Sequence, residues 1–297
     1  NPEDGLCTNS EYGAMPDWDV SSVTDMALAF SDRTDFNGDI SSWDTGNVTS
    51  MYQMFLNASS FNQPIGDWDV SSVSSFKQMF STATSFNQNI SSWVTSSANN
   101  MSYMFSNAFA FNQPLNNWDV SNVTDMKYMF NNATSFNQPL NDWDLINMQY
   151  MEGMFRYATA FNEPLNDWNV GNVTIMNYLF QNASSFNQPI GDWDVSNVTL
   201  MNNMFSNATS FNQNISSWCV SNITSEPTDF SNGSPLSESN KPVWGTCPTA
   251  SVDDQNQLDI SIYPNPTSDI VYIDGNYTQI KVVVYDILGK QVMKESI

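Results

Sequence analysis

Large apolar residues recur along this chain with a period of 25 residues. Tryptophan keeps that period without a slip, and phenylalanine keeps it in two further series, from Phe30 to Phe230 and from Phe36 to Phe211. The nine tryptophans are Trp18, Trp43, Trp68, Trp93, Trp118, Trp143, Trp168, Trp193 and Trp218. A period this strict predicts that every unit occupies the same space, which is typical of a solenoid whose coils pack on their neighbours.

Within one unit the apolar spacing changes from a period of two to a helical period. Trp68 and Val70 alternate as in a short strand over residues 64–71, whereas the apolar positions 73, 76, 79 and 80 have helical spacing. Strands repeated every 25 residues run parallel, because the chain enters each coil in the same direction. The pattern therefore predicts an α/β repeat solenoid with a parallel β-sheet and short helical turns.

Composition divides the chain into four segments. Residues 1–14 precede the first full unit as an N-terminal cap, and residues 15–224 form nine coils. Residues 225–257 are rich in Ser, Pro and Asn and lose the period, which indicates a C-terminal cap and linker. From residue 258 the pattern predicts strands over 258–263, 270–273 and 280–286, in a small partial β-sandwich.

The three cysteines lie outside the regular coils or at their end. Cys219 and Cys247 flank the region that closes the solenoid, where we expect a disulfide, and two buried free thiols are the alternative. Cys7 then remains either free or paired between chains.

The charge and the missing residue types exclude several functions. The chain carries 31 acidic and 8 basic residues, a net charge of −23, and no histidine. Such a chain repels phosphate backbones, so we expect no nucleic-acid partner. No apolar run approaches the roughly 20 residues of a membrane span. The usual hydrolase and nucleotide-binding motifs are absent, so we expect no enzyme and no cofactor, calcium excepted.

Aspartates flank many of the tryptophans and alternate with the apolar positions. Stacked one coil apart, such carboxylates repel one another unless solvent, salt or a cation offsets the charge. Ca²⁺ accepts carboxylate oxygens in flexible geometry, which leads to the hypothesis of weak calcium binding. The candidate ligands are Asp67, Asp69, Asp142, Asp144, Asp192 and Asp194. The alternative is a solvated acidic face, and a calorimetric titration without heat would reject calcium binding.

The tryptophans, the methionines and the asparagines each recur once or more per unit, and each series has a structural and a functional interpretation. Exposed tryptophans would stack on sugars, but their alternation with valine favours the core. The methionines, at three-residue spacing, are typical of packing rather than of a soft metal site. An asparagine follows each phenylalanine of the second series and is expected to bond the backbone of adjacent coils. Departures from the repeat can hold functional information, and they include Lys77, Phe109, Lys127, Arg156, Tyr157 and Ile175.

The repeat resembles the bacterial surface leucine-rich repeats of BspA type, and most closely the 25-residue variant typified by mycoplasma lipoproteins. The residues that carry the signature are Val123, Thr124, Met126, Met129, Phe130, Ala133, Phe136, Asn137, Leu140 and Trp143, with Leu145 in place of the last valine. The likeness covers residues 15–230. It implies a right-handed, leucine-rich-repeat-like rod on a surface-exposed protein.

The C-terminal segment resembles the type A sorting domain of the type IX secretion system of Bacteroidota. The resemblance covers residues 258–297, and its motif residues are Pro264, Asn265, Pro266, Tyr285, Asp286, Gly289 and Lys290. It implies export by the type IX machinery to the outer cell surface or the medium.

Together these features predict a non-catalytic secreted or surface protein that acts in adhesion or molecular recognition through an extended acidic face. Surface proteins and glycans are the expected partners. Two alternatives remain open: self-association of the rods into filaments or a surface layer, and a carbohydrate-binding module.

Overall fold

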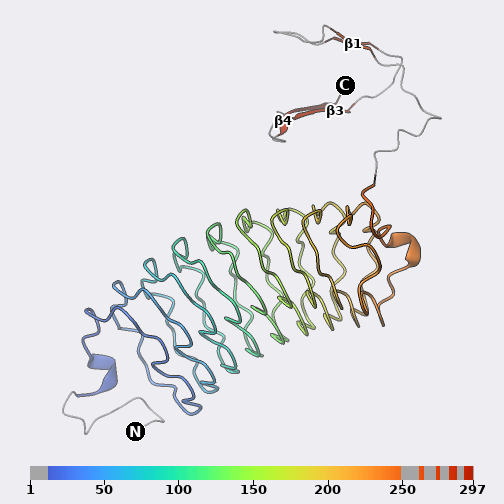
Figure 1. Ribbon diagram of the computed structural model, residues 1–297. Helices are drawn as coiled ribbons and strands as arrows, with labels where there is room; N and C mark the ends of the chain where they lie inside the picture. The colour runs from blue at the N-terminus through green and yellow to red at the C-terminus, as the bar shows by residue number, and fades with distance from the viewer. Residues whose placement is uncertain (1–12, 249–260, 264–271, 275–280, 286–290, 297) are drawn as a thin grey trace. The chain divides into compact units, whose positions relative to one another are not determined.

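The computed structural model describes residues 13–248 and, nearer the C-terminus, residues 261–263, 272–274, 281–285 and 291–296. The chain divides into two compact units, Asn1–Pro248 and Thr249–Ile297. In the first unit the 25-residue coils stack one after another, so equivalent residues of successive coils lie side by side (Figure 1).

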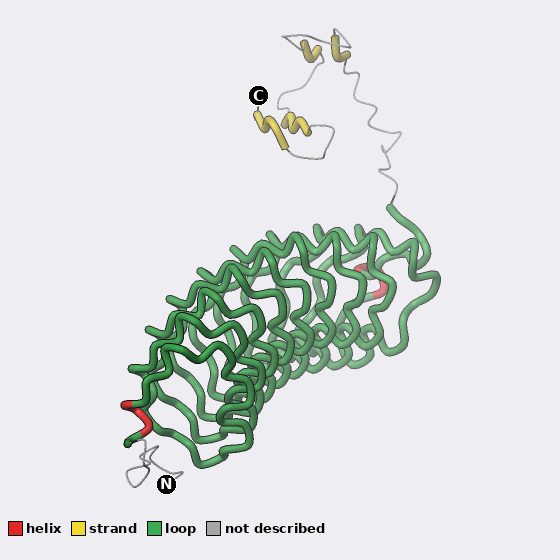
Figure 2. The backbone as a smooth tube through the Cα atoms, turned by 60° about the vertical axis from the view of Figure 1, so that its left-hand side comes forward, coloured by secondary structure: helices red, strands yellow, loops and turns green. Residues whose placement is uncertain are grey.

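The coils contain neither the helical turns nor the sheet that the spacing predicts. In residues 13–248 the helices are two short 3₁₀-helices, η1 (Met15–Asp17) and η2 (Glu238–Asn240), and there is no strand. Nearly the whole solenoid is loop and turn (Figure 2). Seven isolated parallel bridges join one residue of each coil to the next, from Asp25 to Leu200. The expected α/β solenoid with a parallel β-sheet is therefore wrong.

Backbone hydrogen bonds between coils replace the expected helix. In the coil at residues 126–132 the N–H groups of Met126, Tyr128, Phe130 and Asn132 donate to carbonyls 24 residues later, over 3.0, 2.8, 2.9 and 2.7 Å. Tyr128 and Asn132 have φ angles of 54° and 58°. An α-helix needs right-handed residues and bonds from each N–H to the carbonyl four residues before it. The spacing of three between apolar residues comes from tight turns instead.

The segment around each tryptophan is likewise a pair of turns rather than a strand. The N–H of Trp68 donates to the Ile65 carbonyl at 3.3 Å, and the N–H of Val73 donates to the Val70 carbonyl at 2.9 Å. These bonds between residues three apart are typical of β-turns. The link to the neighbouring coil is made by a side chain: the indole Nε1 of Trp68 donates to the Ile40 carbonyl at 3.1 Å.

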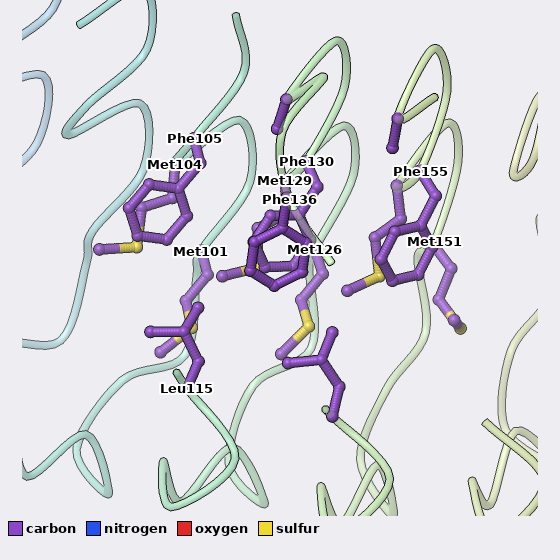
Figure 3. Packing of buried hydrophobic residues seen from close by; sticks show 14 of the residues in the cluster. Met101, Met104, Phe105, Leu115, Met126, Met129, Phe130, Phe136, Met151 and Phe155 are labelled. Atoms are coloured by element: carbon purple, nitrogen blue, oxygen red, sulfur yellow. The ribbon is translucent and has the colours of Figure 1, made fainter. Parts of the chain in front are cut away.

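The core is a set of parallel columns of identical side chains, visible in Figure 3 for the phenylalanines and methionines. Phe105 and Phe130 stack between coils with ring centroids 5.8 Å apart, and Phe130 stacks on Phe136 within its coil at 4.1 Å. The rings of Phe130 and Phe136 are fully buried, and so are the side chains of Met126 and Met129. The methionines are thus packing residues, as their spacing indicates.

An asparagine ladder satisfies backbone groups in the segment that leads into each tryptophan turn. The Oδ1 of Asn112 accepts the backbone N–H of Asn137 at 2.9 Å and the Nε2 of Gln138 at 3.0 Å. The Asn-to-backbone bond recurs in every coil from Asn37 to Asn212. The predicted structural role of these asparagines is confirmed.

The second unit contains four strands in its described residues. β1 (Ser261–Tyr263) pairs antiparallel with β2 (Tyr272–Asp274), and β3 (Lys281–Tyr285) pairs antiparallel with β4 (Gln291–Ser296). These pairs are two separate two-stranded sheets among the described residues, and the expected partial β-sandwich stays a prediction. The first three strands fall within or beside the predicted ranges, while the apolar pattern did not predict β4.

Candidate recognition faces

The aspartates that follow the tryptophans cap turns of their own coil. The Oδ1 of Asp69 accepts the backbone N–H of Ser71 at 2.9 Å, and Asp144 and Asp194 accept the N–H two residues later at 3.0 Å. Short Asx side chains favour this turn because they place an acceptor beside that N–H. Hydrogen bonds from the Ser71 hydroxyl and N–H hold the pKa of Asp69 below its ordinary value. Much of this acidic column thus has a structural role.

Calcium binding by the aspartates stays a prediction. No group of three or more His, Cys, Asp or Glu side chains that could hold a metal occurs in the part of the chain that the structure describes. Asp142, which precedes its tryptophan, accepts a hydrogen bond from the Nδ2 of Asn116 in the neighbouring coil. Asp67 and Asp192 occupy the equivalent place in their coils. A calcium ion would find pairs of carboxylates here, fewer than its usual six to eight oxygens.

The other sequence-predicted sites lie near the end of the solenoid and in the tail. Cys219 and Cys247 form a disulfide bond in the structure. Tyr285 is the last residue of β3. Cys7 and the other sorting-motif residues, Pro264, Asn265, Pro266, Asp286, Gly289 and Lys290, lie outside the described residues.

The tryptophans are core residues. From Trp43 to Trp218 their exposed fractions are 8% or less, and each indole Nε1 donates to a carbonyl 28 residues earlier in the chain. Sugar stacking requires an exposed ring face. The tryptophan column therefore offers no sugar-binding surface, which removes the main reason for a carbohydrate-binding module.

A different face of the solenoid gathers the residues that break the repeat. We call it the tyrosine strip and define it as the eight stacked segments 25–32, 50–57, 75–82, 100–107, 125–132, 150–157, 175–182 and 200–207. All six tyrosines of residues 15–224 lie in it: Tyr52, Tyr103, Tyr128, Tyr150, Tyr157 and Tyr178. Three of the four basic residues of that range lie in it too: Lys77, Lys127 and Arg156. Backbone hydrogen bonds hold these segments in register, as described for residues 126–132.

The basic side chains of the strip lie over the tyrosine rings. The Nζ of Lys127 is 4.9 Å from the ring centroid of Tyr150, and the same nitrogen pairs with Asp125 at 3.5 Å. The Arg156 guanidinium lies 5.0 Å from the Tyr157 ring and 5.4 Å from the Tyr178 ring. Cation–π contacts of this kind hold a long flexible side chain in a defined place. The strip is therefore an ordered surface rather than a set of isolated charges.

Tyr128 is half-buried between Tyr103 and the Glu152 carboxylate. Its ring stacks on Tyr103 with centroids 5.0 Å apart, and its hydroxyl donates to the Glu152 carboxylate at 3.2 Å. Burial, together with that carboxylate, raises the pKa of Tyr128 above its usual range. The ring covers Gly153, which has a φ of 58°, and a Cβ there would collide with the ring.

The strip is visible in the sequence only in part. Lys77, Lys127, Arg156 and Tyr157 stand out as departures from the repeat, but singly they indicate no site. The signal that unites them is their position within the unit: all lie within the same eight of 25 positions. Phe109 lies outside this range, so the departures do not all belong to one face.

Comparisons with known families agree with the two-part organisation. A family described as Mycoplasma protein of unknown function, DUF285, matches residues 6–113, 93–180 and 140–244. A secretion system C-terminal sorting domain matches residues 261–297. Searches of the curated proteins and of the solved structures found no match. Among the described residues, no helix is both long enough and apolar enough to cross a bilayer.

These matches establish the coarse identity of the chain. The sorting domain indicates export through the type IX system, so this is a secreted or cell-surface repeat protein. The mycoplasma-type repeat is confirmed, whereas the leucine-rich-repeat assignment is not. Because the first model matches well over half of the chain, the protein belongs to the DUF285 family of mycoplasma-type repeat proteins.

Proposed function

We propose that this chain is a non-catalytic recognition protein that acts in adhesion outside the cell, with its solenoid as the binding surface. The observation that carries the proposal is the confinement of all repeat tyrosines to one face of the coils. Tyrosine and arginine are, together with tryptophan, enriched where proteins bind one another tightly. Their confinement to one face is what a binding surface on a uniform framework requires.

The framework supports this role because it holds surface residues at fixed spacing. Each coil repeats the same buried columns, the same indole-to-carbonyl bond and the same asparagine bond. Side chains on such a framework lose little further freedom on binding, which lowers the entropic cost of association. Stacked repeats also create extended surfaces that suit long or flat partners.

Binding of the full chain to an array of extracellular proteins and glycans tests the proposal. We expect saturable binding to at least one of these classes, and weaker binding by a chain whose strip residues are replaced. Failure to bind any class would contradict recognition as the function.

Size in solution separates recognition from assembly. We expect the full chain to elute with the mass of a single chain, 33.4 kDa, in light scattering coupled to size exclusion. A charge of −23 makes identical rods repel one another, which opposes side-by-side association. Long polymers under the same conditions would favour the filament alternative.

A further inference from the structure

Resting on the proposed function, we propose that the tyrosine strip binds a positively charged polypeptide, centred on Tyr128, Arg156, Tyr157 and Tyr178. Three features of the strip favour such a partner: the way the aromatic rings are covered, the distribution of charge, and the residue types that the repeat accepts at these positions.

The arrangement of the rings favours a polypeptide over a sugar. Tyr103 and Tyr128 face one another with an interplanar angle of 20°, and Lys127 and Arg156 cover faces of Tyr150, Tyr157 and Tyr178. Sugars stack on open ring faces, and several of these faces are occupied. Ring edges and phenolic hydroxyls suit a protein surface, which offers both apolar contacts and hydrogen-bond partners.

Charge selects the sign of the partner. At the centre of the strip two acidic residues, Asp125 and Glu152, balance two basic ones, Lys127 and Arg156. Around that neutral centre, the rest of residues 15–224 carries 16 acidic and 2 basic side chains. An aromatic centre inside an acidic surround is complementary to a partner with apolar side chains surrounded by lysine and arginine. An acidic partner, including a second copy of this chain, would be repelled.

The strip offers aromatic and apolar area that the partner can bury. Tyr157 and Leu200 are 38% and 42% exposed, and Leu28 at the other end of the strip is 52% exposed. In other coils the same positions also hold small or polar residues (Asp, Asn, Ser, Thr, Gln or Gly), so a large apolar side chain is not required there by the fold. The same coil conformation accepts apolar and polar residues at these positions, so the exposed apolar side chains are not needed for folding.

The repeat itself supplies the test substitutions. At the position of Tyr128 other coils carry Gln78 or Asn203, at that of Arg156 they carry Gln181, and at that of Tyr157 they carry Asn132. The strip variant is therefore Y128Q/R156Q/Y157N/Y178N in the full chain. A matched control, V94N/I146S, replaces two exposed apolar residues outside the strip by residues found at the same positions in other coils, Asn169 and Ser121, and leaves the charge unaltered.

The probe is a phage-displayed library of random 12-residue peptides, selected on the immobilised full chain at physiological salt. We expect the enriched peptides to carry net positive charge and at least one aromatic or large aliphatic residue. Synthesised singly, they should bind the strip variant at least tenfold more weakly than the unaltered chain, and bind the control within twofold. Thermal unfolding of both variants verifies that they fold.

Two outcomes overturn the inference. Enriched peptides that are acidic or neutral would contradict the charge argument, and peptides that bind the strip variant undiminished would place recognition on another face. In either case binding of the full chain to the protein and glycan array would leave the proposed function in place. If that array is also negative, the proposed function fails as well.

Discussion

The tryptophan side of each coil and the tyrosine strip are held together by different kinds of bond. On the tryptophan side, side chains make the connections: the indole of Trp143 donates to the Leu115 carbonyl at 2.9 Å, and Asn112 accepts the N–H of Asn137. In the strip, backbone N–H groups donate to backbone carbonyls of the next coil, as from Tyr128 to Glu152 at 2.8 Å.

This difference explains where the repeat is uniform and where it varies. A bond made by a side chain demands one residue type, so tryptophan recurs in all nine coils and an asparagine follows each of the eight phenylalanines from Phe36 to Phe211. A bond made by the backbone places no such demand on the side chain. The outward-facing positions of the strip are therefore free to carry Ser, Asn, Tyr, Lys or Arg, whereas its core positions, such as Met129 and Phe130, stay apolar. Binding residues can accumulate at these outward-facing positions.

The largest effect is expected on the side where side chains connect the coils. Asn112→Ala removes the acceptor of two donors, the Asn137 N–H and the Gln138 amide, and should lower the free energy of unfolding by about 3 kcal/mol. Urea unfolding of the full chain measures it. Lys127→Ser in the strip, which loses a partly exposed ion pair, is the control and should cost under ~1 kcal/mol. Equal effects would contradict the comparison.

Gly153→Ala tests the one place where a strip side chain constrains the backbone. The left-handed φ of 58° disfavours alanine, and the Tyr128 ring occupies the space of the new Cβ. We expect a loss of about 2 kcal/mol, with a melting temperature lower by roughly 4–8 °C. Adding Tyr128→Gln to this variant should recover part of the loss. A double variant less stable than the sum of its single changes would disprove the clash.

The pH dependence of stability reports on the aspartate-capped turns. Ser121 donates its hydroxyl at 2.6 Å and its N–H at 3.0 Å to Asp119, which lowers the pKa of that carboxyl in the folded state. The stabilisation is present above the ordinary carboxyl pKa and is lost as the pH falls through the lowered folded value. Asp119→Asn keeps an acceptor, as Asn169 does for the N–H of Gly171.

The two chains should therefore differ in melting temperature at pH 7 and converge towards pH 3. Comparing them directly cancels the general loss of charge repulsion on acidification. A difference that stays constant over this range would show that the Asp119 carboxylate does not contribute through its ionised form.

The smallest effect is expected for Tyr157→Asn. Tyr157 has a φ of 57° and is 38% exposed, and asparagine adopts left-handed angles more readily than tyrosine. The change should leave the free energy of unfolding within ~0.5 kcal/mol or raise it slightly. Thermal unfolding measures it, and a loss above ~1 kcal/mol would show that this tyrosine is part of the fold rather than of a binding surface.

The repeat could be predicted from the sequence, whereas the conformation of one coil could not. Periodic Trp68 and Phe80 predict stacked coils and a buried aromatic core, because identical units bury apolar residues only against one another. The spacing of residues 73, 76, 79 and 80 suits a helix and a run of tight turns equally. Residues with a left-handed backbone conformation, such as Gln78, show that the segment forms turns. The sequence does not predict this, because glutamine has no preference for a positive φ.

The candidate site shows the same division. Sequence alone determined that the chain is a long acidic repeat followed by a segment similar to a secretion sorting domain, and it identified Lys127 and Arg156 as exceptions to the repeat. Only the tertiary structure decided that these cations lie over tyrosines of the same or the next coil. The physical reason is that residues 25 apart in sequence become neighbours once the coils stack. The sequence shows each departure from the repeat singly. The surface that these residues form together is visible only in the structure, where neighbouring coils bring them side by side.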